Sequence, residues 1–220
     1  LYQKILDKNP EMADVWHLMG ILAHQNEKNE LSVKLIETAI SINDTKADFH
    51  NDLGRIYSKL GNLLDAEAKY RRAIEINSFH VKALSNLAGL LRMKGEFTSA
   101  VDYARLAVSC GPEDPEAYNN LGNSLKDVNL VDEAVLAYQK AIDLAPDYAL
   151  AHWNISLALL SLEKFEVGFE EMMWRWKWNG FPVKPRSLKK PSLEHLRNAN
   201  DGLRDKRILL CAEQGLGDTI

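Results

Sequence analysis

Residues 115–148 read PEAYNNLGNSLKDVNLVDEAVLAYQKAIDLAPDY, and this stretch decides the fold. Its apolar residues recur at three- and four-residue spacing on both sides of a short break at Asn129, a pattern typical of two amphipathic helices. The pattern recurs every 34 residues without insertion over 13–46, 47–80 and 81–114. We therefore predict an all-α chain built from stacked pairs of antiparallel helices.

Small residues stand at two fixed positions of each unit, and a bulky residue follows the second of them in three units. These sets are Gly20, Gly54, Ala88 and Gly122; Ser32, Ala66, Ala100 and Ala134; and Ile36, Tyr70 and Tyr138. We expect paired small residues such as Gly54 and Ala66 to lie where the two helices cross, because a larger side chain would overpack that contact by about 1–3 kcal/mol. Gly61, Gly95 and Asn129 occupy the break, where a helix commonly ends on a left-handed residue.

The period and the W…LG…Y…A…F…A…P pattern resemble the tetratricopeptide repeat. The resemblance implies a right-handed superhelical solenoid with four complete units over 13–148. Tyr2, Ile5 and Pro10 match the second helix of a preceding repeat, truncated to residues 1–12. Because the chain starts in mid-repeat at Leu1 rather than at a methionine, we interpret it as a fragment of a longer protein.

Composition limits the classes of function. The net charge is −4 and the repeats contain no basic block, which argues against a nucleic-acid partner. No apolar run approaches the length needed to span a membrane. The two cysteines, Cys110 and Cys211, provide no disulfide framework, so we expect a reducing, cytoplasmic location. No metal site is predicted, since His17 and His24 lie two helical turns apart, roughly 10 Å by helix rise.

A fifth, atypical unit is predicted over 149–178, with a second helix from Phe165 to Trp178 and Gly168 at its small position. Its end carries three alternating tryptophans, Trp174, Trp176 and Trp178. They could form a stacking platform for a sugar or a base. The favoured interpretation is that they close the solenoid and pack the following domain, because terminal repeats are characteristically atypical.

The periodicity stops after Trp178. Residues 179–206 combine prolines with lysines and arginines and are predicted to be a linker, whose basic run is more simply a solvated segment than a phosphate site. Residues 207–213 form a short apolar run typical of one buried strand, and Gly215 and Gly217 follow it. A strand that leads into a glycine pair is how the first turn of an α/β domain starts. A P-loop is excluded because its lysine is absent.

This tail resembles the point at which bacterial tetratricopeptide proteins continue into a glycosyltransferase-like domain of the heptosyltransferase and O-linked N-acetylglucosamine transferase class. Leu216-Gly217-Asp218 matches the L-G-D element of the heptosyltransferases. The resemblance implies that Asp218 is a general base in the intact domain, on a loop shaped by Gly215 and Gly217. The alternative is that Asp218 caps a helix. The W-x-G of such linkers is not evident around 191–196.

The resemblance also implies a nucleotide sugar as cosubstrate of the parent protein, and we expect neither a cofactor nor transferase activity from this chain by itself. Without the remaining strands, residues 207–213 have no sheet to join. We expect this segment to be disordered, docked on the repeats or paired with another copy, which would give self-association through the tail.

The predicted binding surface is the concave face formed by the first helices. Asp52, Asn86, Asn120 and Asn154 share one offset and resemble the asparagine ladder of O-linked N-acetylglucosamine transferase, whose amides hold a peptide main chain. The partner is thus expected to be a protein or an extended peptide. Further residues predicted for the same groove are Asn51, Arg55, Arg92, Asn119, Asn123 and Lys126.

Two alternatives remain open for this face. The asparagines could instead be solvated or could bond the neighbouring repeat. A clamp for chaperone tails needs lysines and arginines at positions that here hold residues such as His17, Ile21 and Asp52, so the match is poor. The chain is therefore predicted to be either the presenting arm of a glycosyltransferase or a non-catalytic scaffold for protein assembly.

Overall fold

The computed structural model describes residues 2–180, which form an all-helical solenoid. Residues 181–206 of the predicted linker and all of 207–220, with the expected strand, Gly215, Gly217 and Asp218, lie outside the described residues. The first helices of the pairs are α2 (Ala13–Gln25), α4 (Ala47–Lys59), α6 (Val81–Met93), α8 (Pro115–Asp127) and α10 (Ala149–Ser161). The second helices are α3 (Asn29–Ile42), α5 (Leu63–Ile76), α7 (Phe97–Cys110), α9 (Val131–Leu144) and α11 (Phe165–Met172), and α1 (Tyr2–Leu6) precedes them all.

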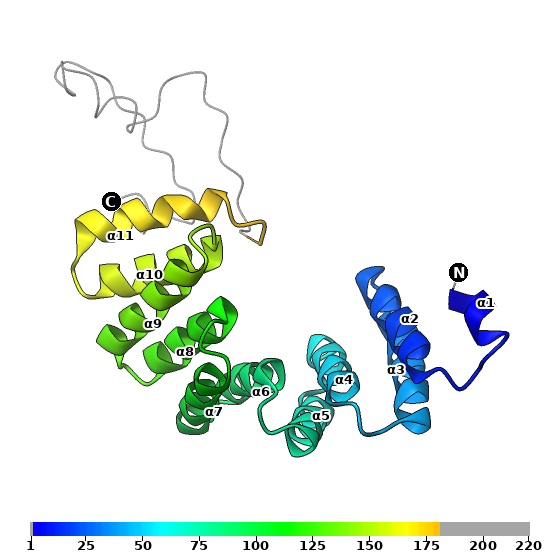
Figure 1. Cartoon of the computed structure of the whole chain (residues 1–220). Coiled ribbons are helices and arrows are strands. Elements are labelled where there is room, and N and C mark those ends of the chain that lie inside the picture. The colour runs from blue at the N-terminus through cyan, green and yellow to red at the C-terminus, as the bar shows by residue number, and fades with distance from the viewer. Residues whose placement is uncertain (1, 181–220) are drawn as a thin grey trace, which may run out of the picture.

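The helix pairs stack into an open arc (Figure 1). Each second helix packs against its own first helix, and each of those before α11 also packs against the first helix of the next unit. Successive first helices also contact one another, whereas no second helix described here contacts another second helix. The first helices α4, α6 and α8 therefore lie along the inside of the arc, and their exposed side chains form its concave face.

The helices of a pair cross at the small residues, as predicted, but the bulky residue is part of the same contact. A Cβ atom added to Gly54 would lie 3.1 Å from the carbonyl oxygen of Ala66 and 2.8 Å from the ring of Tyr70. At Gly122 the added atom would lie 2.5 Å from the ring of Tyr138. Glycine is therefore required because the tyrosine ring lies directly on the backbone of the first helix.

The break between the helices has the same backbone conformation in all five pairs. Gly61, Gly95 and Asn129 have φ angles of 82°, 80° and 62°, which confirms the predicted left-handed residue. Glu27 and Glu163 hold the equivalent positions with φ angles of 60° and 59°, although glutamate has no preference for this region. The next residue closes the first helix by a backbone bond to the carbonyl five residues earlier, as from Asn62 N to Tyr57 O at 2.9 Å.

The fifth pair ends differently from the expectation. Helix α11 stops at Met172 and continues as a 3₁₀ turn, η1 (Met173–Trp176), so the predicted single helix to Trp178 is wrong. Tighter winding turns Trp174 back onto α10, where its ring stacks on His152 with centroids 3.9 Å apart. Lys177 Nζ lies 3.6 Å from the centroid of the same indole ring. Trp174 thus packs against its own unit, which favours a closing role for it. None of the helices within residues 2–180 is long and apolar enough to cross a bilayer.

Candidate partner-binding groove

A polar hollow of about 310 Å³ lies on the concave face where α4, α6 and α8 meet, and we call it the central slot. It brings together five of the residues that the sequence predicted for partner binding, namely Asn51, Asp52, Arg55, Asn86 and Asn120. Its other lining residues are Lys82, Ser85, Asp114 and Glu116, which the sequence reasoning did not single out. The repeat register was the available signal, since Ser85 has the offset of Asn51 and Lys82 has that of Glu116.

Charges of both signs line the central slot, where Asp52 lies beside Arg55 on α4. Arg55 of α4 and Lys82 of α6 provide cations, and Asp114 and Glu116 at the start of α8 provide carboxylates. Asp114 also caps α8, because its Oδ1 accepts hydrogen bonds from the backbone N–H groups of Glu116 and Ala117, at 2.9 and 3.1 Å. The slot is therefore suited to a ligand with both donors and acceptors rather than to an anion alone.

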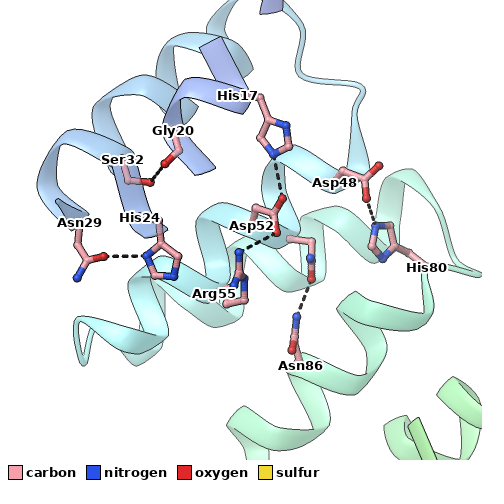
Figure 2. A network of polar contacts seen from close by, with 11 residues as sticks. His17, Gly20, His24, Asn29, Ser32, Asp48, Asp52, Arg55, His80 and Asn86 are labelled. Atoms are coloured by element: carbon pink, nitrogen blue, oxygen red, sulfur yellow. Dashed lines mark hydrogen bonds and ion pairs between the residues drawn. The ribbon is translucent and has the colours of Figure 1, made fainter. Parts of the chain in front are cut away.

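Side chains on successive first helices are hydrogen bonded across a separation of 35 residues. Asn86 Nδ2 donates to Asn51 Oδ1 at 2.9 Å (Figure 2). Asn154 Nδ2 donates to Asn119 Oδ1 at 2.8 Å, and both of these side chains are buried. We call this row of contacts the inter-repeat ladder. In this structure Asn86 and Asn154 therefore bond the neighbouring repeat, which the sequence had left open as an alternative to binding a partner.

The first step of the inter-repeat ladder joins an imidazole to a carboxylate rather than one carboxamide to another. His17 Nε2 lies 2.9 Å from Asp52 Oδ2 (Figure 2), and the His17 ring packs on Phe49 with centroids 4.5 Å apart. Asp52 also faces Arg55, whose guanidinium lies 3.6 Å from Oδ1. The Asp52 carboxylate is thus held by partners on two sides, which fixes the position of Arg55 beside the central slot.

One step of the inter-repeat ladder is open. Ser85 and Asn120 are the pair that corresponds to Asn51 with Asn86, but no hydrogen bond joins them. The Ser85 hydroxyl is buried and has no partner among the described residues. Asn120 retains a half-buried carboxamide at the wall of the central slot. The oxygen of serine is one bond closer to the backbone than that of asparagine, which accounts for the missing contact.

The remaining predicted groove residues lie elsewhere on the first helices. Arg92 Nε donates to Asp127 Oδ2 at 2.6 Å, which links α6 to α8. Asn123 Oδ1 accepts from the hydroxyl of Tyr138 at 2.8 Å. Asn119 and Asn154 are bonded to each other, and Lys126 is half-buried in α8. Arg92, Asn119 and Asn154 thus bond across units, whereas Asn123 bonds within its own unit, and none of these side chains lines the central slot. Within residues 2–180 no three potential ligands are grouped as a metal site.

Family models for the tetratricopeptide repeat match residues 51–115 and 115–148. The chain contains tetratricopeptide repeats. The matched segments cover α4 to α9 apart from the first residues of α4, and they include all nine residues that line the central slot.

The curated relatives of this chain are distant in sequence and longer than it. Protein FlbA of Caulobacter vibrioides is 22% identical over 99% of this chain and 42% of its own length. The peroxisomal targeting signal receptor of Kluyveromyces lactis is 22% identical over 78% of this chain and 37% of the receptor. Protein O-mannosyl-transferase TMTC3 of Mus musculus is 28% identical over 74% of this chain and 20% of that protein. The chain thus spans less than half the length of these relatives.

Solved structures with the same fold include the Cut9–Hcn1 complex of the APC/C, which superposes with a TM-score of 0.72 at 17% identity over 79% of this chain and 35% of that one. YrrB, described as a TPR protein with an unusual peptide-binding site, superposes with a TM-score of 0.59 at 19% identity over 79% of this chain and 89% of that one. At these identities the similarity establishes the repeat solenoid alone.

Proposed function

We propose that the concave face of this repeat solenoid binds an extended segment of a partner protein. The observation that carries the proposal is the central slot, where carboxamides, cations and carboxylates from three successive first helices line one hollow. An extended peptide exposes alternating N–H and C=O groups, and a carboxamide can donate to one and accept from the other. Three adjacent units thus provide complementary groups without a deep apolar pocket.

The relatives support a peptide partner. The names of two of them refer to recognition of a targeting signal and to a peptide-binding site, namely the Kluyveromyces lactis receptor and YrrB. Both carry the repeat architecture of this chain. The charges beside the slot suit a segment with acidic and basic side chains, the acidic ones towards Arg55 and Lys82 and the basic ones towards Asp114 and Glu116.

A displayed library of random dodecapeptides, selected on the whole 220-residue chain, tests the proposal. We expect selected peptides to bind the parent chain and to lose about tenfold or more in affinity when Arg55 and Lys82 are both changed to glutamate, because like charges then face the acidic side chains. The control is Gln139→Ala, which removes an exposed carboxamide from the second helix α9. Peptides that bind both variants as tightly as the parent would show that the concave face is not the binding surface.

We further propose that the solenoid is the presenting arm of a longer, bacterial and cytoplasmic glycosyltransferase. This proposal is supported by the L-G-D element at 216–218 after an apolar run, and by the similarity of the repeats to those of protein O-mannosyl-transferase TMTC3. Asp218 would be the general base for the acceptor hydroxyl, and the sugar donor would be a nucleotide sugar bound by the parent protein.

Sugar transfer by the longest protein that contains this sequence tests the second proposal. We expect that protein to consume a nucleotide sugar and Asp218→Asn to lower turnover at least about a hundredfold, as removal of a general base does. Full activity in Asp218→Asn would reject the base assignment. A longer protein that lacks transferase activity and still binds the selected peptides would be a non-catalytic scaffold for assembly of protein complexes.

A further inference from the structure

His152 of α10 faces a hydrogen-bond acceptor with each of its two ring nitrogens. Nε2 lies 2.9 Å from the carbonyl oxygen of Pro146, and Nδ1 contacts the carboxylate oxygen Oε2 of Glu171 on α11. Because a carbonyl oxygen can only accept, Nε2 must carry a hydrogen. A neutral imidazole would then present a bare lone pair at Nδ1 to the carboxylate, and that contact would be repulsive. A proton therefore lies between Nδ1 and Glu171.

The surroundings of this proton favour its attachment to the imidazole ring. A carboxylic acid is a stronger acid than an imidazolium ion in water, and the Glu171 side chain retains contact with solvent at 27% exposure. The indole ring of Trp174 stacks on the imidazole with the two planes only 3° apart. A stacked indole attracts a cation through its π-electrons. The pair is therefore an imidazolium donating from Nδ1 to a carboxylate.

The repeat register provides a comparison within the chain. His50 has the position of His152, and its Nε2 also lies against a carbonyl oxygen, that of Asp44 at 3.0 Å. The position of Glu171 is held in that unit by Lys69. Burial, and after it the charge of Lys69, lowers the pKa of His50, whose buried Nδ1 has no partner. The unit with lysine thus leaves Nδ1 bare, and the unit with glutamate provides an acceptor for a proton there.

We propose that His152, Glu171 and Trp174 form a proton-dependent latch, which fastens the 3₁₀ turn η1 to α10 while the imidazole is protonated. The imidazolium joins α10 to α11 through the carboxylate and joins α10 to η1 through the stacked indole. When the Nδ1 proton leaves for solvent, a lone pair faces the carboxylate and the indole loses its cation. Glu171 then turns towards water, and η1 separates from α10.

The other charged groups at the latch belong to η1 and the residue after it. Lys177 Nζ lies 3.6 Å from the centroid of the stacked indole, so its charge opposes a second cation on this ring and favours release of the proton. The guanidinium of Arg175 lies 4.4 Å from the centroid of the Trp176 ring. In the part of the chain that the structure describes, no charged side chain of α8 or α9 forms a hydrogen bond or ion pair with His152. Glu171 is thus the group that retains the proton.

NMR of the imidazole nitrogens in the whole chain reads the first half of the proposal. At about pH 7.5, where a solvated imidazole is mostly neutral, we expect hydrogens on both Nδ1 and Nε2 of His152. His50 in the same spectrum should carry a hydrogen on Nε2 only. In Glu171→Gln the amide donates to Nδ1, so His152 should also carry a hydrogen on Nε2 only. A bare Nδ1 at His152 in the parent chain would overturn the proposal.

Amide hydrogen exchange tests whether the proton holds η1. At about pH 9, where the latch proton is lost, the backbone amides of Met173–Trp176 should exchange about tenfold faster in the parent than in Glu171→Gln. The variant keeps the contact without a proton, because its amide remains a donor to Nδ1. At about pH 6 the two chains should exchange at the same rate.

Glu170→Gln is the matched control, since it removes the neighbouring exposed carboxylate of α11. It should exchange like the parent chain at both pH values. Equal exchange in the parent and Glu171→Gln at the higher pH would show that η1 stays on α10 without the proton, and the latch would be rejected.

Discussion

His50 and His152 occupy the same position in two repeats, and the Nε2 atom of each contacts a backbone carbonyl, yet the surroundings of their Nδ1 atoms differ. Nε2 of His50 lies 3.0 Å from the carbonyl of Asp44, and Nε2 of His152 lies 2.9 Å from the carbonyl of Pro146. The Nδ1 atom of His50 is buried without a partner, whereas Nδ1 of His152 contacts the carboxylate of Glu171. Histidines at the same position of the repeat thus differ in what faces Nδ1, which is a carboxylate at His152 and no hydrogen-bond partner at His50.

The first prediction concerns His50 and pH. Burial lowers the pKa of His50 below its ordinary value of 6.5, and the positive charges of Lys69 and Arg72 lower it further. The unfolded chain therefore binds this proton at a higher pH than the folded chain does. The contribution of neutral His50 to stability is complete above pH 6.5 and declines as the pH falls towards the lowered value.

His50→Leu removes this pH dependence, and leucine already stands at the equivalent position 84. We expect the free energy of unfolding in urea to fall less between pH 7 and pH 5.5 in the variant than in the parent chain. Gln139→Ala should retain the parent slope. Equal slopes in His50→Leu and the parent would mean that other groups dominate the acid sensitivity.

The second prediction concerns the two glutamates in the left-handed region. Glu27 and Glu163 have positive φ angles where other units use glycine or asparagine. Glu27→Gly and Glu163→Gly should each raise the free energy of unfolding by about 1 kcal/mol, because glycine adopts this conformation without steric cost. The reciprocal Gly61→Glu should lower it by a similar amount, since open space surrounds Gly61 and only the backbone is strained. Thermal or urea unfolding measures all three variants.

The third prediction separates two glycines within first helices. An added methyl at Gly122 would meet the ring of Tyr138 at 2.5 Å, whereas one at Gly89 would meet nothing within 4 Å. Gly122→Ala should therefore destabilise the chain by about 1–3 kcal/mol. Gly89→Ala should stabilise it by about 0.5–1 kcal/mol, because alanine has the higher helix propensity. A stabilised Gly122→Ala would show that the Tyr138 ring moves aside at little cost.

The fourth prediction distinguishes two asparagines with the same offset. Asn154→Ala leaves the buried Oδ1 of Asn119 without its donor, so the free energy of unfolding should fall by about 1–3 kcal/mol. Asn120→Ala breaks no hydrogen bond with a described residue and should change stability by less than about 0.5 kcal/mol. Urea unfolding of both variants checks the contrast. Equal losses would mean that Asn120 also supports the fold.

Much of the fold could be predicted from the sequence because the small residues and the breaks depend on local geometry. The conformations of Gly61, Gly95 and Asn129 follow from helix termination, and the approach of Gly54 to Ala66 follows from helix crossing. The same reasoning missed Glu27 and Glu163, because no residue preference marks a left-handed glutamate. In those units the repeat geometry overrides the local preference.

The site was less predictable because partners lie 35 residues apart. The sequence shows that Asn86 and Asn154 share an offset, but not that their amides point to Asn51 and Asn119. That direction depends on how successive first helices stack, which is a tertiary property. The ending of α11 at Met172 was also missed, since stacking of Trp174 on His152 competes with continuation of the helix.

The equal length of the units has a consequence for how such a groove can change in evolution. Excision of residues 81–114 as one block would remove Ser85 and bring Asn120 into the register that Asn86 now has with Asn51. In the shortened protein every step of the inter-repeat ladder would be closed, the first by His17 with Asp52 and the others by paired asparagines. Duplication of the same block would create a second open step of the inter-repeat ladder one unit away. Recognition in this architecture can therefore be gained, lost or multiplied by recombination of whole units, without any new side chain.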